Sequence, residues 1–152
     1  MNPSTIEVLL VEDNIHEVEL TERVFRKFNM ANKFFHVSDG EEALEFIFCT
    51  GKYAGKRKVF NTPKVILLDI QLPKVSGIEV LEKIKSDERT RSTPVVILTA
   101  SKEDPHIKRC YELGANGYIA KPVNFEQFSE MIKTLGFYWL LLNERPIQTR
   151  EE

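Results

Sequence analysis

The chain alternates between short apolar runs and longer segments in which apolar residues recur every three or four positions. Short apolar runs bounded by polar residues are typical of strands buried in a parallel sheet. We place five such strands at residues 6–11, 33–38, 65–68, 95–98 and 116–120. Each periodic segment begins near a residue that commonly caps helices, and these residues are Asn14, Asp39, Ser76, Ser101 and Asn124. Five strand–helix repeats predict a doubly wound α/β domain with one five-stranded parallel sheet.

Two segments depart from this rhythm. Residues 49–63 contain glycines and four basic residues without periodicity, and we interpret them as an insertion loop before the third strand. A solvated basic loop is the simplest interpretation of this segment. The last helix keeps its apolar spacing as far as Leu142 if it passes through Gly136. We therefore predict a single domain over residues 1–143 and a loose polar tail at residues 144–152.

The end of the last helix is unusually rich in apolar residues. Ten of them lie from Phe128 to Leu142, more than one face of a sheet can cover, so an apolar patch is expected at the surface. We predict a symmetric homodimer through this helix, with contacts from Phe128, Leu135, Tyr138 and Trp139. In the alternative, the last turns fold back onto their own domain.

Composition narrows the class of protein without naming an activity. A chain of 152 residues is long enough to bury one core without disulfides. The net charge of -2 gives no electrostatic reason to expect nucleic acid or an anionic membrane as a partner. The longest apolar run is too short to span a bilayer, and the N-terminus lacks the pattern of a signal peptide. Cys49 and Cys110 form no paired motif, so we expect free thiols in a cytoplasmic protein.

A polar or charged residue follows or ends four of the apolar runs. The carboxyl ends of parallel strands meet at one edge of a sheet, so we expect these side chains to converge in one crevice. They are Glu12 and Asp13 after the first run, Asp69 after the third, Thr99 after the fourth and Lys121 after the fifth. By contrast, His16, His36 and His106 stand alone and form no metal-binding motif.

The converging residues suit a metal ion and a phosphoryl group. Three carboxylates at close range stay ionised only when a cation joins them, and oxygen ligands of this kind suit Mg²⁺. One divalent ion and Lys121 would balance the three negative charges. Attack of a carboxylate on phosphorus gives an aspartyl phosphate, and the central carboxylate, Asp69, is the natural nucleophile. Lys121 and Thr99 would stabilise the oxygens of the transferred group.

These residues resemble the signature of response-regulator receiver domains of two-component signalling. Leu72-Pro73 and Gly77 match the loop after the phosphoacceptor of that family, and the resemblance covers residues 6–135. It implies a flavodoxin-like sheet with strand order 2-1-3-4-5. It also implies phosphorylation of Asp69 by a sensor histidine kinase.

The resemblance further implies roles for individual residues. Asp13, Asp69 and the backbone carbonyl of Gln71 would hold Mg²⁺, with Glu12 acting through water. Thr99 and Tyr118 would form a switch pair that changes the face made by the fourth helix, the fifth strand and the fifth helix. The family also leads us to expect a cis peptide bond between Lys121 and Pro122.

Several alternatives stay open within and beyond this family. We expect no output domain after the last helix and therefore a stand-alone receiver. The long loop and the aromatic extension resemble those of stand-alone receivers that serve phytochrome-type kinases. A generic single-domain receiver in a phosphorelay or motility pathway is the alternative. A haloacid-dehalogenase-type phosphatase fits less well, because its nucleophile follows the first strand. A flavodoxin-like electron carrier would need a phosphate-binding loop after the first strand, and this sequence lacks one. We expect a phosphoryl acceptor and not an enzyme.

Overall fold

A computed structural model describes residues 6–30 and 34–144 of the chain as one α/β structure. Its five strands are all parallel and lie in the order β2-β1-β3-β4-β5, which confirms the predicted topology. Their bounds are β1 (Val8–Val11), β2 (Phe34–Val37), β3 (Val65–Leu68), β4 (Val95–Thr99) and β5 (Gly117–Ala120).

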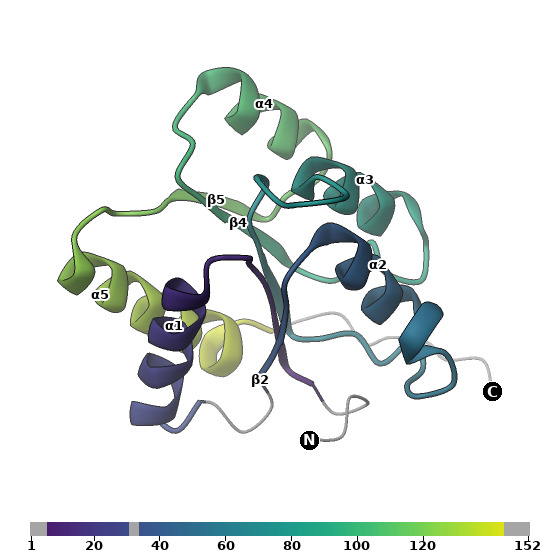
Figure 1. Cartoon of the computed structure of the whole chain (residues 1–152), viewed down its shortest axis with the longest axis horizontal. Coiled ribbons are helices and arrows are strands. Elements are labelled where there is room, and N and C mark those ends of the chain that lie inside the picture. Colours follow the sequence, from purple (N-terminus) through teal and green to yellow (C-terminus); the bar gives the residue numbers. More distant parts are fainter. Residues whose placement is uncertain (1–5, 31–33, 145–152) are drawn as a thin grey trace.

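Five α-helices cover the two faces of this sheet (Figure 1). They are α1 (Ile15–Lys27), α2 (Gly40–Phe48), α3 (Gly77–Ser86), α4 (Asp104–Glu112) and α5 (Phe125–Gly136). The helices α1 and α5 lie on one face, and α2, α3 and α4 lie on the other. Side chains alternate along each strand, so the sheet supplies apolar residues to a separate core on each face.

The predicted helix starts are confirmed at four of five positions. The side chains of Asn14, Asp39, Ser76 and Asn124 accept hydrogen bonds from backbone N–H groups of the first turn. The prediction is wrong for α4, whose cap is Glu103 without a side-chain hydrogen bond. A proline in the first turn of α4 removes one donor that would otherwise need a partner.

The insertion at residues 49–63 is a solvated basic loop only in part, because Lys52, Lys56 and Lys58 are exposed but Arg57 is not. It contains a short 3₁₀ helix, η2 (Gly51–Tyr53), and it buries the side chains of Tyr53 and Arg57. Arg57 donates hydrogen bonds to the carbonyls of Phe46 and Ile47 and lies over the ring of Phe46. A guanidinium group thus caps the last carbonyls of α2, where unpaired acceptors favour a cation.

The C-terminal extension also differs from the prediction. The helix passes through Gly136, but it continues as a π-helical segment, η3 (Phe137–Leu142). A side chain on Gly136 would collide with Met30 at 2.8 Å, so glycine permits the close approach of α5 to the end of α1. Leu140 is buried and Phe137 packs edge-on against Phe28, so part of the extension folds back onto its own domain.

The dimer prediction is therefore wrong for two of its four residues. Phe128 and Leu135 are 5% and 8% exposed and belong to the core beneath α5, so they offer no surface to a second chain. Their helical spacing correctly indicated a buried face, but that face packs within the chain. Tyr138, Leu141 and Leu142 remain exposed at the end of the extension.

Three smaller expectations can be compared with the described residues. No peptide bond in the described part of the chain is cis, so the expected cis bond before Pro122 is wrong, and the proline keeps the more stable trans form. Cys49 and Cys110 are free thiols, as predicted. Among the described helices, none has the length and apolar content needed to cross a membrane. Residues 145–152 of the predicted tail lie outside the described residues.

The buried position of Arg57 leads to a stability prediction. Replacing it by alanine (Arg57→Ala) leaves several carbonyl groups without a donor, and we expect the free energy of unfolding to fall by about 2–3 kcal/mol. The control is Lys56→Ala, an exposed neighbour, for which a change within about 0.5 kcal/mol is expected. Urea denaturation measures both variants, and equal stabilities would show that the cap contributes nothing.

Candidate functional site

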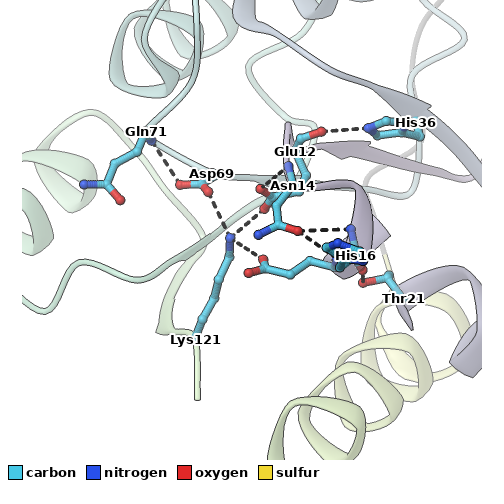
Figure 2. Close-up of polar contacts among 9 residues, drawn as sticks. Glu12, Asn14, His16, Thr21, His36, Asp69, Gln71 and Lys121 are labelled. Atoms are coloured by element: carbon cyan, nitrogen blue, oxygen red, sulfur yellow. Dashed lines mark hydrogen bonds and ion pairs between the residues drawn. The ribbon is translucent and has the colours of Figure 1, made fainter. Parts of the chain in front are cut away.

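The predicted site residues meet at the carboxyl end of the sheet (Figure 2). Glu12 follows β1, Asp69 follows β3 and Lys121 follows β5. The ammonium nitrogen of Lys121 lies 2.6 Å from Glu12 Oε1 and 2.9 Å from Asp69 Oδ2, and all three side chains are buried. The expected convergence is confirmed, and it depends on the central position of β1 and β3 in the sheet.

Lys121 has a third carboxylate partner that sequence reasoning missed. Glu17 Oε1 lies 2.6 Å from Lys121 Nζ. Glu17 lies in the first turn of α1, four residues after Asp13, and its backbone N–H donates to the side chain of Asn14. This turn lies at the carboxyl end of the sheet, so its position in the sequence could have indicated that Glu17 is near the site.

Burial and ion pairing shift the pKa values in this cluster. Burial raises the pKa of Glu12 to about 7, although hydrogen bonds from Lys121 and Asn14 oppose the shift. Burial alone would lower the pKa of Lys121, but its contacts with the carboxylates of Glu12, Glu17 and Asp69 outweigh that effect and raise the pKa. Lys121 is therefore charged at neutral pH. Glu12 gains or loses its proton near neutral pH when Lys121 is the only cation beside it.

Local backbone structure fixes the orientation of the carboxylates. The N–H of Gln71 donates to Asp69 Oδ1 at 3.0 Å, and the N–H of Asn14 donates to Glu12 Oε2 at 3.1 Å. Gly77 brings the start of α3 against this turn, and a Cβ atom there would lie 2.1 Å from the carbonyl oxygen of Asp69. Only glycine permits this approach without moving the backbone.

The acidic cluster has the composition of a magnesium site. Oxygen atoms of Glu12, Asp13 and Asp69 lie within 4.8 Å of one another, and Asp13 is exposed while the other two are buried. Carboxylate oxygens with access to water suit Mg²⁺, which keeps part of its hydration shell in proteins. The cluster can therefore hold a divalent ion, and the backbone of Gln71 lies beside it. The role of the Gln71 carbonyl as a ligand stays a prediction.

Thr99 ends β4, and Tyr118 lies on the neighbouring strand β5. Thr99 is fully buried, and its hydroxyl has no hydrogen-bond partner among the described residues. Tyr118 donates from its hydroxyl to the carbonyl of Ser101 at 2.9 Å. The hydroxyl of Thr99 thus has no partner among the described residues, while that of Tyr118 is held, and the role of these two residues as a switch pair stays a prediction.

Two histidines that the sequence analysis set aside have defined polar partners. His36 Nε2 donates to the carbonyl of Glu12 at 2.7 Å and so steadies the end of β1 (Figure 2). His106 Nδ1 lies 2.6 Å from the hydroxyl of Ser101. No pattern in the sequence connects either histidine to these positions, because both contacts depend on the fold.

Comparison with models of protein families matches residues 8–133 to the response regulator receiver domain. The chain belongs to this family. The family assignment sets aside both the phosphatase and the electron carrier as alternatives.

Individual relatives support the same assignment. The chain is 37% identical over 139 residues to the probable methanogenesis regulatory protein FilR2 of Methanothrix harundinacea, covering 91% of this chain and 86% of that protein. The crystal structure of the phosphorylated cyanobacterial phytochrome response regulator RcpA is similar with a TM-score of 0.84 and 34% identity, covering 92% and 97% of the two chains. The Mn²⁺-bound form of response regulator Rcp1 gives a TM-score of 0.85 at 31% identity, covering 92% and 98%.

The raised pKa of Glu12 predicts a pH-dependent metal affinity. A protonated Glu12 weakens binding of Mg²⁺ to the acidic cluster, so metal affinity should rise as the pH passes through about 7. We expect about tenfold tighter binding at pH 8 than at pH 6, measured by calorimetry. In Glu12→Gln the dependence should flatten. An equally steep dependence in this variant would contradict the assignment of the titrating group.

Proposed function

We propose that this receiver accepts a phosphoryl group from a histidine kinase on Asp69 in a Mg²⁺-dependent reaction. The observation that carries the proposal is the pairing of a buried ammonium with Asp69, beside a buried hydroxyl that has no partner. Lys121 and Thr99 are the two donors that a phosphoryl group on Asp69 requires. The product would be a phosphorylated signalling state, so the protein would act as an acceptor and not as a turnover enzyme.

The proposed reaction transfers the phosphoryl group from the kinase's histidine to Asp69. An oxygen of Asp69 forms a bond to phosphorus while the bond from phosphorus to the imidazole nitrogen of the kinase's phosphohistidine breaks. The imidazole leaves with the electron pair. When bound, Mg²⁺ would neutralise the carboxylates and stabilise charge on the phosphoryl oxygens. Asp13, Asp69 and the Gln71 carbonyl would hold it, with Glu12 acting through water. Lys121 neutralises Asp69 and orients its carboxylate.

We further infer that phosphorylation changes the α4-β5-α5 face. A phosphoryl group adds negative charge and acceptor oxygens beside the unpaired hydroxyl of Thr99. A hydrogen bond from Thr99 to the phosphoryl group would draw the end of β4 inward. The segment that carries Ser101 would then shift, and the hydroxyl of Tyr118 would lose its partner. Phosphorylation thus favours a second arrangement of this face because only that arrangement forms the new bond.

A groove between α1 and α5 supports docking of a protein phosphodonor. A cavity of about 410 Å³ opens beside the loop that follows Lys121, and one of about 250 Å³ continues along the two helices. Leu20, Arg23 and Phe125 line both cavities, and Phe125 is 60% exposed. The larger cavity is also lined by Glu17, a partner of Lys121, so a kinase that approaches Asp69 along this groove would find apolar surface to bury.

The similarity to RcpA favours a phytochrome-type kinase as the partner. RcpA is a phytochrome response regulator, and its structure covers nearly all of this chain. The chain is also similar to FilR2, a probable methanogenesis regulatory protein, so a generic single-domain receiver stays the alternative. A histidine kinase is the partner under both alternatives.

Replacement of the proposed nucleophile gives the direct test of phosphotransfer. Asp69→Asn keeps the shape of the side chain and removes the attacking carboxylate. We expect the hydroxylamine-labile phosphate formed with acetyl phosphate and Mg²⁺ to fall by roughly tenfold or more. Asp87→Asn, at the end of α3, is the matched control and should behave as wild type. An undiminished acyl phosphate in Asp69→Asn would place the nucleophile elsewhere.

We also propose a symmetric dimer through the exposed end of η3. Leu141 and Leu142 are 63% and 70% exposed, and Tyr138 beside them packs edge-on against Trp139. Adjacent aromatic and aliphatic side chains of this kind are common at the centre of protein interfaces. Trp139 is half-buried, so it would contribute at the edge of the contact.

Charging the exposed leucines tests this dimer. We expect light scattering to give wild-type protein twice the 17.6 kDa chain mass. The double variant Leu141→Glu/Leu142→Glu should give the chain mass itself, because burial of two carboxylates is costly. Tyr111→Glu, on α4, removes an exposed aromatic from another surface and should stay dimeric. A wild-type monomer would refute the dimer, and dissociation by Tyr111→Glu alone would move the interface to α4.

A further inference from the structure

Glu17 stands apart from the other partners of Lys121. Its side chain is 30% exposed, whereas Glu12 and Asp69 are 4% and 7% exposed. Glu17 Oε1 lies 2.6 Å from the ammonium nitrogen, yet it is the one of the three contacts that lacks hydrogen-bond geometry. Its greater exposure to solvent makes Glu17 the partner with the most freedom to turn away from Lys121.

The charges around the site show what Glu17 adds. Glu12, Asp13 and Asp69 carry three negative charges, which Lys121 and a divalent ion would balance. Glu17 brings a fourth carboxylate to the same ammonium group, so the pocket with its ion would carry one negative charge in excess. An excess negative charge opposes the arrival of a phosphoryl group.

The oxygens of a phosphoryl group on Asp69 would also compete with the carboxylates for hydrogen bonds from the ammonium group of Lys121. An ammonium group has three N–H donors, and three carboxylates already surround this one. Backbone N–H groups hold the second oxygens of Glu12 and Asp69 in place. Glu17 instead lines the cavity of about 410 Å³, which gives its side chain room to turn away. Glu17 is thus the partner that can make way for a phosphoryl oxygen.

Building on the proposed phosphorylation of Asp69, we propose that Glu17 is a positioning residue that holds Lys121 in its resting place and competes with the phosphoryl oxygen for it. The unmodified state is thereby stabilised relative to the phosphorylated one. The first turn of α1 thus sets how readily Asp69 becomes modified. Among the described residues, the side chain of Glu17 pairs with Lys121 and not with the proposed metal ligands Asp13 and Asp69, so its effect runs through Lys121.

Beryllofluoride, which mimics a phosphoryl group on a carboxylate, tests this proposal. It is titrated at saturating Mg²⁺ into wild type, Glu17→Gln and Glu22→Gln, with fluorine NMR as the readout. We expect half-saturation of Glu17→Gln at about fivefold lower beryllofluoride concentration, because a competing charge is removed. Glu22→Gln is the matched control, since it removes the same charge from α1 where Glu22 pairs with Arg26. It should stay within about twofold of wild type.

A second readout separates positioning from a general effect on the fold. The nitrogen NMR signal of the Lys121 ammonium group should shift in Glu17→Gln and stay in place in Glu22→Gln. Unchanged or weaker beryllofluoride binding by Glu17→Gln overturns the role of Glu17 while leaving phosphorylation of Asp69 intact. Absence of binding in wild type overturns the proposed function itself, and this role with it.

Discussion

The site depends on one interaction, the buried ammonium group of Lys121 held among carboxylates from separate parts of the chain. Glu12 and Asp69 follow the two central strands, and Glu17 lies on the first helix. Removing one partner of a buried ion pair leaves a charge without compensation and costs about 3–5 kcal/mol. The parallel order of β1, β3, β4 and β5 is what brings these groups together. The same order places the hydroxyl of Thr99 at the edge of the cluster.

The rest of the fold keeps this charged cluster in place. Two apolar cores, one on each face of the sheet, fix the strands whose ends carry the site residues. The strands β1, β3 and β4 are buried on both faces, whereas the connections at the carboxyl end of the sheet carry the chemistry. The groups that we propose to move on phosphorylation, Thr99, the Ser101 segment and Glu17, all lie at this end. Binding of a phosphoryl group can therefore change the surface without disturbing the core.

Much of this structure follows from the sequence, for reasons that also explain the failures. Apolar periodicity reports burial, so it predicted the five strands, their helices and the convergence of Glu12, Asp69 and Lys121. It does not report what a buried face packs against, which is why Phe128 was assigned to a dimer contact. Long polar side chains are harder still, because their partners depend on the path of the chain in space. Arg57 and Glu17 were missed for this reason, although basic and acidic residues near helix ends were visible in the sequence.

The central claim is that Lys121 and Thr99 together receive a phosphoryl group on Asp69. A crystal structure of the protein with Mg²⁺ and beryllofluoride tests it most directly. We predict beryllium bound to an oxygen of Asp69, with Lys121 Nζ and Thr99 Oγ1 each about 2.7–3.2 Å from a fluorine atom. A complex in which beryllofluoride lies elsewhere, or in which the Thr99 hydroxyl still has no partner, would contradict the claim.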